Sequence, residues 1–312
     1  MIAAITLLVA TDRATAAELL RVGKSPGYLF AYTPLDVGIA TGIFRAKDIE
    51  IEEVSFEGAS KMNQGVVVGA IDIALGSPMD MSVMAKGMPA RSIAVIAEPM
   101  IEFVLLVPFD SPIRSIDDLK GKTIGIATVG SITQWVALEL ANVKGWGPDG
   151  VRTVAIGAGG AAAHAAMGAH LVDATVSTTM VGVVLERQKV ARTLTRVADY
   201  APPFIAHTMS ATNAIIAAKP DAVRRFVAGW FESVAFMRGH RPETIAITQA
   251  VTGFSGADEE TEYDRLMPEV TARGDFDPQS IARIAHSFVE LGILEKEPDM
   301  TRLFTEEFLP RR

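Results

Sequence analysis

The chain has 312 residues, of which 49% are hydrophobic and 21% charged, so it can bury a sizeable core and is not a disordered chain. It has 29 Lys and Arg against 37 Asp and Glu, a net charge of −8, which argues against nucleic-acid binding and against a polybasic membrane-surface protein. Because the chain has no cysteine, disulfides, iron–sulfur clusters, Cys-ligated zinc, thiolate catalysis and a Cys lipid anchor are all excluded.

The N-terminal segment, residues 1–17, is typical of a secretory signal. Residues 2–10 form an apolar run, and small residues that suit cleavage near Ala16 or Ala17 follow it. The usual basic residues before the run are missing, so an ordinary N-terminus is the alternative. The run is too short to span a membrane, and no internal stretch reaches the ~18 apolar residues that a spanning helix needs. We expect an exported, soluble periplasmic protein without a lipid anchor.

Short β-rich runs alternate with helical patterns over the first two thirds of the chain. This alternation predicts βαβ units and mainly parallel sheets, and the Val, Ile and Leu content suits strands buried on both faces. The predicted strands span residues 19–24, 49–56, 71–76, 92–97, 103–107, 123–128, 151–156, 173–178, 192–197 and 208–217.

Several helix starts carry capping signals. Ser77 precedes Pro78, which predicts an N-cap followed by proline at the first helical position. Ser131 and Gln134 have the spacing of a capping box. The last third of the chain is predicted to be helical over residues 223–236, 242–251, 259–269 and 281–291.

Two segments of the chain resemble each other. In residues 69–77 and in residues 168–177, a helix ends at glycine, a strand follows, and a serine stands at the carboxyl end of that strand. This similarity suggests two lobes built on one plan.

The order of several short motifs resembles that of periplasmic solute-binding proteins of the nitrate/sulfonate/taurine type. These proteins are receptors of ATP-driven importers, and they share a fold with thiamine-pyrimidine-precursor-binding proteins. The motifs are VGKSP at 22–26, GIFRA at 42–46, DIALGSP at 72–78, SIDDLKGKTIG at 115–125, GAGG at 157–160 and KPDAVR at 219–224.

The resemblance implies an α/β, type II periplasmic-binding fold. Two lobes, each a mainly parallel sheet flanked by helices, would be joined by two crossover segments near residues 103–109 and 204–211. Lobe 1 would comprise residues 18–106 and 208–312, and lobe 2 residues 107–207. A cleft between two such sheets binds its ligand beyond the carboxyl ends of the strands, and hinge closure traps the ligand.

The resemblance also implies a function without a catalytic step or a cofactor. The partners would be a small-molecule solute and the membrane permease of an ATP-driven importer, with no nucleic acid, and we expect a monomer. The alternative is a metabolic enzyme on the same bilobal scaffold that acts on pyrimidine precursors or small carboxylates.

Hydroxyl groups follow two predicted strands of lobe 2. The first set begins a helix whose free N–H groups would face the cleft and attract an anion, although an ordinary helix cap is the alternative. The second set would hydrogen-bond to a polar solute or cap the following helix. The candidate ligand contacts of lobe 2 are Thr128, Gly130, Ser131, Thr133, Ser177 and Thr178.

The candidate contacts of lobe 1 lie in the turns after its first three strands. Lys24 would pair with a carboxylate or sulfonate, or would be solvated, and Tyr28 would form an aromatic wall. His207, at the return crossover, would either donate to the ligand or be structural. We expect a carboxylate- or sulfonate-bearing solute with an apolar or aromatic body. The candidates here are Lys24, Ser25, Tyr28, Gly58, Ser60, Ser77, Pro78 and His207.

Other signals for chemistry are weak. Residues 157–162 fit a dinucleotide-binding glycine pattern, but no ribose-binding acid follows the next strand, so we reject NAD and FAD. Hydrolase, P-loop, zinc-protease and EF-hand motifs are absent, and the five histidines do not have the spacing of metal ligands.

Overall fold

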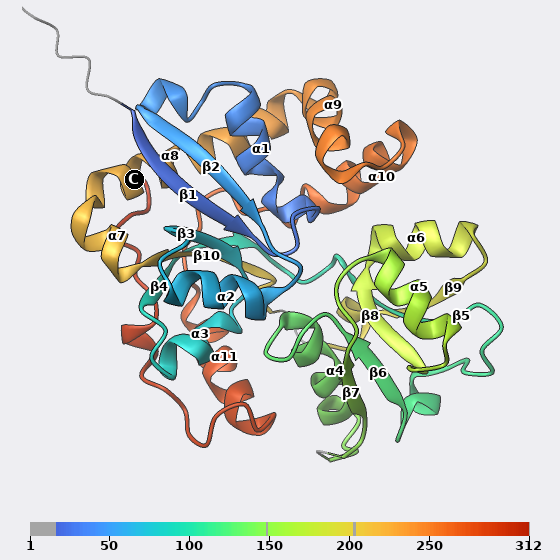
Figure 1. Ribbon diagram of the computed structural model, residues 1–312. Coiled ribbons are helices and arrows are strands. Elements are labelled where there is room, and N and C mark those ends of the chain that lie inside the picture. The colour runs from blue at the N-terminus through green and yellow to red at the C-terminus, as the bar shows by residue number, and fades with distance from the viewer. Residues whose placement is uncertain (1–16, 148, 202–203, 312) are drawn as a thin grey trace, which may run out of the picture.

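Two five-stranded sheets divide the protein into two lobes in the computed structural model (Figure 1). The structure describes residues 17–147, 149–201 and 204–311, so residues 1–16 of the expected signal segment lie outside the described residues. We define lobe 1 by the first sheet and lobe 2 by the second. Among the described residues, no helix is both long and apolar enough to cross a membrane.

The sheet of lobe 1 has the strand order β2-β1-β3-β10-β4. β1, β2 and β3 are parallel to one another, whereas β10 is antiparallel to both of its neighbours. The strands are β1 (Glu18–Lys24), β2 (Ile49–Ser55), β3 (Ile73–Gly76), β4 (Ala90–Ala97) and β10 (His207–Thr212).

The sheet of lobe 2 repeats this arrangement in the order β7-β6-β8-β5-β9, with β5 as its antiparallel strand. Its strands are β5 (Phe103–Pro108), β6 (Thr123–Ile126), β7 (Arg152–Ala155), β8 (Ala174–Thr178) and β9 (Ala191–Arg196). β3 and β8, which belong to the two similar segments of the sequence, occupy the same central position in their sheets. Each sheet is therefore mixed, with four strands in one direction and one opposed.

The antiparallel strand in each sheet is the first strand that the chain forms after it crosses between the lobes. The first crossover lies between Ala97 and Phe103, and the second between Arg196 and His207. The expectation of a crossover near residues 103–109 is wrong, because residues 103–108 form β5 and pair with β8 and β9 inside lobe 2.

Helices cover both sheets. Lobe 1 contains α1 (Thr33–Ala40), α2 (Ala59–Val67) and α3 (Asp80–Ala85), and lobe 2 contains α4 (Ile132–Val143), α5 (Gly160–Gly168) and α6 (Thr179–Arg187). The C-terminal section forms α7 (Asn213–Ala218), α8 (Pro220–Gly239), α9 (Arg241–Thr252), α10 (Gly256–Leu266) and α11 (Pro278–Glu290).

One predicted strand is wrong over half its length. Residues 213–218 form α7 rather than an extension of β10, because Thr212 caps a helix there. Its Oγ1 accepts a hydrogen bond from the N–H of Ile215 at 3.2 Å. The other nine predicted strands and the four C-terminal helices are present, with bounds that differ by a few residues.

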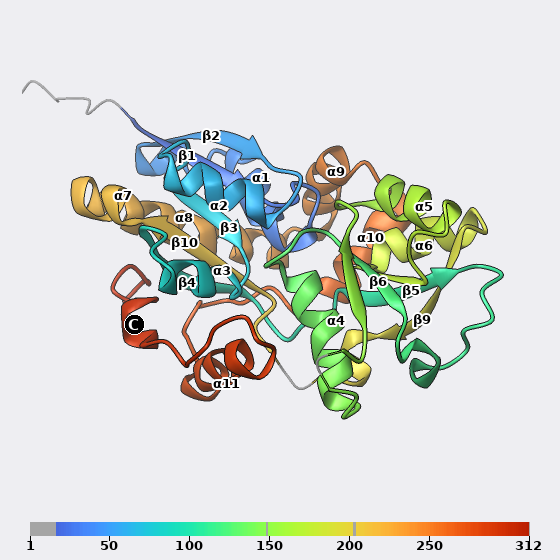
Figure 2. The ribbon, with the colours of Figure 1, turned by 60° about the horizontal axis from the view of Figure 1, so that its bottom comes forward.

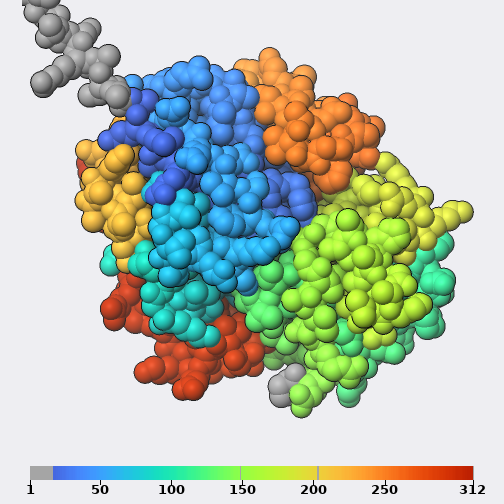
Figure 3. Space-filling model, viewed as in Figure 1, coloured from blue at the N-terminus to red at the C-terminus, as the bar shows by residue number. Residues whose placement is uncertain are grey.

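The C-terminal helices link the lobes. α8 and α9 pack on α1 of lobe 1, and α10 lies beside α6 of lobe 2 in both ribbon views (Figures 1 and 2). Across this boundary the guanidinium of Arg187 in α6 donates to the carboxylate of Asp258 in α10 at 2.6 Å. In the space-filling view the surfaces of the two lobes meet (Figure 3).

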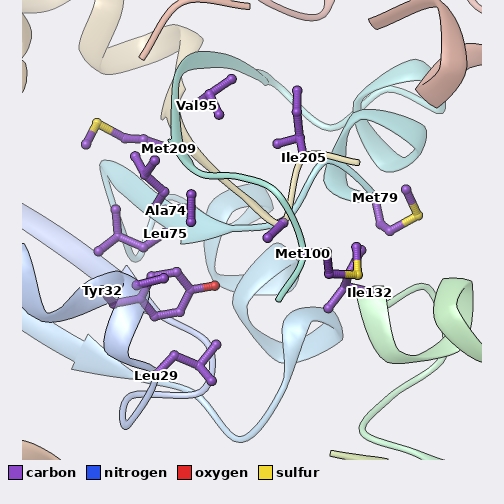
Figure 4. Packing of buried hydrophobic residues seen from close by; sticks show 14 of the residues in the cluster. Leu29, Tyr32, Ala74, Leu75, Met79, Val95, Met100, Ile132, Ile205 and Met209 are labelled. Atoms are coloured by element: carbon purple, nitrogen blue, oxygen red, sulfur yellow. The ribbon is translucent and has the colours of Figure 1, made fainter. Parts of the chain in front are cut away.

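The hydrophobic core is continuous across the lobe boundary. One cluster of buried side chains includes Leu29 and Met79 of lobe 1, Met100 of the first crossover and Ile132 of lobe 2 (Figure 4). Because these side chains exclude water from the boundary, the structure shows the lobes in a closed arrangement.

Candidate functional site

A cavity of about 60 Å³ lies between the lobes. Turns at the carboxyl ends of β1, β2 and β3 form its lobe-1 wall, and turns after β6, β7 and β8 form its lobe-2 wall. The cavity therefore stands at the position where open α/β sheets bind ligands. The side chains and turns that line it belong to Ser25, Pro26, Tyr28, Leu29, Tyr32, Gly58, Ala59, Gly76, Ser77, Phe103, Ala127, Ser131, Ile132, Thr133, Ile156, Gly157, Ala158, Gly159, Ala163, Thr175, Val176, Ser177, Thr178 and His207.

Most of the candidate residues from the sequence line this cavity. The structure brings together Ser25, Tyr28, Gly58, Ser77, Ser131, Thr133, Ser177, Thr178 and His207. The remaining candidates, Lys24, Ser60, Pro78, Thr128 and Gly130, are not among the lining residues.

Lys24 is buried inside lobe 1, which corrects both expectations for it. Its ammonium lies 2.9 Å from a carboxylate oxygen of Asp36 and 2.9 Å from one of Glu53, so it faces neither solvent nor the cavity. Burial raises the pKa of Asp36 to about 6, although the ammonium of Lys24 opposes that rise. The basis for a lysine-bound anionic solute is therefore absent.

Ser60 and Thr128 lie where the two lobes meet, and Gly130 follows Thr128 in the same turn. The Ser60 hydroxyl donates to the carbonyl of Val129 at 2.8 Å, which joins the start of α2 to the turn before α4. A Cβ atom on Gly58 would lie 2.5 Å from Cγ2 of Thr128. Ser60 and Thr128 thus contact the opposite lobe.

The capping prediction for Ser77 and Pro78 is wrong. α3 begins at Asp80 instead, and the carboxylate of Asp80 accepts a hydrogen bond from the N–H of Ser77 at 3.0 Å. Asn63 donates to the other oxygen of this carboxylate at 2.8 Å. Burial raises the pKa of Asp80. A buried carboxylate therefore stands behind the Ser77 turn.

Three lining hydroxyls of lobe 2, those of Ser131, Thr133 and Thr178, already have partners within the protein. Ser131 Oγ donates to the carbonyl of Thr128 at 2.6 Å and lies 2.8 Å from Thr133 Oγ1, which accepts from the N–H of Ala127 at 2.9 Å. Thr178 Oγ1 caps α6 by accepting from the N–H of Val181 at 3.4 Å. Ser131 precedes α4, but its side chain makes no capping hydrogen bond. The prediction of a capping box at Ser131 is wrong in this respect.

Two hydroxyls of the lobe-1 wall differ from these three. Ser25 is 8% exposed and Ser77 is 4% exposed, yet the Oγ atom of each is buried without a hydrogen-bond partner. A buried hydroxyl without a partner costs about 1–3 kcal/mol, so a ligand that satisfies these groups gains affinity.

The side chain of His207 connects the two crossovers through its contacts. Its Nε2 contacts the carboxylate of Glu102 in the first crossover, and its Nδ1 lies 3.0 Å from Tyr32 Oη and 3.1 Å from the carbonyl of Gly76. Because protein groups engage both ring nitrogens, the contacts favour the structural alternative for this histidine.

Tyr28 and the apolar side chains form most of the remaining wall. The Tyr28 ring lies 3.7 Å from the point where a Cβ on Gly159 would stand, so the two lobes come close here. Burial raises the pKa of Tyr28 to about 12. Sequence analysis missed Phe103, Ile132 and Ile156 as lining residues, because nothing in the sequence distinguishes them from ordinary core.

Buried carboxylates lie beside the cavity, where α10 meets the first crossover. Glu102, Glu262 and Glu269 are each less than 5% exposed. Burial, followed by the charge of Glu102, raises the pKa of Glu262 to about 7 and raises that of Glu269 well above its usual range. Thr179 of lobe 2 donates to the Glu262 carboxylate at 3.4 Å. Among the described residues, no group of three or more histidines and acids has an arrangement that could hold a metal ion.

Several proteins of known structure share this fold. The chain superposes on the alkanesulfonate-binding protein SsuA from Xanthomonas axonopodis pv. citri bound to MOPS, with a TM-score of 0.79, 20% identity, and coverage of 94% of this chain and 99% of the other. The periplasmic aliphatic sulphonate-binding protein SsuA from Escherichia coli gives a TM-score of 0.72 at 21% identity, with 92% and 91% covered.

A Candida albicans protein described as having the generic periplasmic binding protein fold gives a TM-score of 0.80 at 16% identity, with 95% of this chain and 98% of the other covered. The desulfurization enzyme DSZB is a more distant structure, with a TM-score of 0.63 at 16% identity, and 92% and 97% covered. These likenesses show the fold.

No curated protein sequence matches the chain. The family model described as NMT1/THI5 like matches residues 30–244, more than half of the chain. The resemblance found in the sequence is thus confirmed for family and fold. With two mixed sheets facing one cavity, the chain has the periplasmic binding protein fold and belongs to the NMT1/THI5-like family.

Proposed function

We propose that the chain is an extracytoplasmic receptor that captures a small organic solute between its lobes and delivers it to an ATP-driven importer. The observation that carries the proposal is the cavity built from the strand ends of both lobes. A solute reaches such a cavity when the lobes part, and it is trapped when they close. The sulfonate-binding and import-system proteins that share the fold support the same class of function.

The proposal includes export and partners. Cleavage near Ala16 or Ala17 would release a periplasmic protein that starts close to β1. The membrane permease of the importer would be its macromolecular partner, and the receptor would act as a monomer. N-terminal sequencing of the protein from its native cells tests the export step, because an intact Met1 or Ile2 on the native protein contradicts it.

The proposal contains no catalytic step. The enzyme DSZB shares the fold, and one of its structures is a cysteine-to-serine variant in complex with biphenyl-2-sulfinic acid. This chain has no cysteine at any position. Both nitrogens of His207, which lines the cavity, are engaged by protein groups, so that imidazole is not available as a general base.

Solution scattering and melting curves test closure together. The purified protein is unfolded, dialysed to remove bound compound, refolded, and measured with and without the compound recovered from it. We expect the compound to reduce the radius of gyration and to stabilise the protein by about 2.7 kcal/mol at a hundredfold excess over Kd. A compound that raises the melting temperature but leaves the scattering profile unchanged contradicts closure.

A further inference from the structure

The polar groups of the cavity are distributed unevenly between the lobes. On the lobe-1 side, Ser25 and Ser77 line the cavity, and their hydroxyls are buried without a partner. On the lobe-2 side, the hydroxyls of Ser131, Thr133 and Thr178 are engaged within their own turns. Among the described lining residues, the hydroxyls that are buried without a partner thus lie in the turns after β1 and β3.

Several amides at the helix starts of the cavity are also engaged. After β6, the N–H of Ala127 donates to Thr133 Oγ1 and that of Gly130 to Gln134 Oε1 at 2.7 Å. After β8, the N–H of Thr179 donates to the carbonyl of Glu102 at 2.7 Å. After β3, the N–H of Ser77 donates to Asp80. At these three turns the protein's own oxygens thus occupy positions that a sulfonate or carboxylate could use.

The charges around the cavity also disfavour an anion. Among the described residues that line it, none is Lys or Arg. The buried carboxylate of Asp80 lies behind Ser77, and that of Glu102 lies behind His207. Because these carboxylates are buried, they repel an anion beside them more strongly than they would in solvent.

We propose that the solute is uncharged, with one hydrogen-bonding group that lies between the Ser25 and Ser77 hydroxyls and an apolar body that faces lobe 2. The apolar body would pack on Tyr28, Phe103 and Ile156, which line the rest of the cavity. This inference rests on the proposed receptor function, and it replaces the anionic solute expected from the sequence.

Matched probes that differ in charge but hardly in shape test the class of solute. The pairs are benzamide with benzoate and methanesulfonamide with methanesulfonate, and MOPS is added as a larger sulfonate. Binding to the refolded, compound-free protein is measured by calorimetry and by the melting temperature, each at 10 mM or below. The compound extracted from the purified protein is identified by mass and its net charge is determined by electrophoresis.

We expect the uncharged member of a pair to bind at least tenfold tighter than the anion, and the extracted compound to be uncharged at pH 7. Tighter binding of benzoate, methanesulfonate or MOPS, or an extracted carboxylate or sulfonate, overturns the inference but leaves the receptor function intact. A protein that yields no compound and binds no probe overturns the receptor function, and the inference with it.

Substitution of single hydroxyls tests the position of the polar group. Ser25→Ala and Ser77→Ala should each weaken binding of the extracted compound about twofold to tenfold, as loss of one hydrogen bond does. Thr208→Val is the matched control, because Thr208 Oγ1 is also buried without a partner but does not line the cavity. Equal affinities in both serine variants and the control overturn the proposed placement, and melting curves of the compound-free variants verify folding.

Discussion

Thr128 of lobe 2 occupies the space that a side chain on Gly58 of lobe 1 would need. A Cβ on Gly58 would lie 2.5 Å from Cγ2 of Thr128, closer than packed carbon atoms approach. Gly58 has a φ of 169°, an extended conformation open to any residue, so the backbone alone does not require glycine there. The closed arrangement of the lobes does require it.

Gly58→Val should therefore hold the lobes apart. We expect the radius of gyration with saturating compound to remain near that of the compound-free protein, and the affinity to fall tenfold or more, as overpacking predicts. Gly168→Ala is the control, because a Cβ on Gly168 would meet no atom within 4 Å. Normal compaction of the Gly58→Val variant by scattering would show that the lobes do not meet here in the bound form.

The ion pair between Arg187 and Asp258 joins α6 of lobe 2 to α10 of lobe 1. Because Arg187 is largely exposed, the pair contributes little and is screened by salt. Arg187→Gln should lower the affinity for the compound a fewfold at low ionic strength and have no effect in 0.5 M NaCl. An exchange variant, Arg187→Asp with Asp258→Arg, should restore the affinity; failure of this rescue, or a loss that is independent of salt, counts against the role of the pair in closure.

Glu262 should make the stability of the protein depend on pH. Its pKa is about 7 in the folded protein because of burial and the charge of Glu102, against an ordinary value of 4.5. The folded state therefore binds more protons than the unfolded state between these values. By linkage, the free energy of unfolding is highest below pH 4.5 with respect to this group and falls as the pH rises toward 7, by up to about 3 kcal/mol.

Urea unfolding at intervals between pH 5 and pH 8 measures this effect. The groups that face Glu262 are Glu102, Glu259, Arg265 and Thr179. The pKa of Glu269 is raised as well, again by burial and by the charge of Glu102. Glu262→Gln should flatten part of the decline and stabilise the protein at pH 8. Glu50→Gln, at an exposed position of β2, is the control. A Glu262→Gln variant with the slope of the parent protein would refute the assignment.

Lys24 should contribute to folding and not to the charge selectivity of the site. Lys24→Met leaves Asp36 and Glu53 without their shared ammonium, so we expect a loss of about 3–5 kcal/mol in the free energy of unfolding. The affinity of the folded fraction should stay within about twofold of the parent value. Lys61→Met removes an exposed ammonium paired with Glu57 and serves as the control. A large, salt-sensitive loss of affinity without a loss of stability would restore Lys24 as a ligand contact.

The strands could be predicted because their signals are local, whereas the two lobes were expected from the resemblance to solute-binding proteins. Runs of β-branched residues between glycine and proline turns identify the strands, and strand ends identify most turns of the cavity. The error at α7 has a local cause as well. Ile215 and Ile216 favour a strand, and the Thr212 cap that starts the helix carries little weight in a sequence.

The contacts of Lys24 and the apolar wall could not be predicted, because they depend on tertiary structure. Asp36 and Glu53 lie 12 and 29 positions from Lys24, and the fold alone brings the three charges together. In the same way, Ser25 and Ser131 have identical side chains in similar turns. The structure shows that one hydroxyl is unpaired while the other already donates to Thr128.

The antiparallel strands β5 and β10 make lobe 2 an insertion whose two ends adjoin. Val104 in the first strand of lobe 2 pairs with Arg196 in its last, and Ala97 pairs with His207 where the chain leaves and re-enters lobe 1. Both cut points therefore need only a short linker to close. A lobe with other turns could therefore be grafted between Ala97 and His207. Such a graft would change half of the recognition surface, while every strand of lobe 1 kept its neighbours.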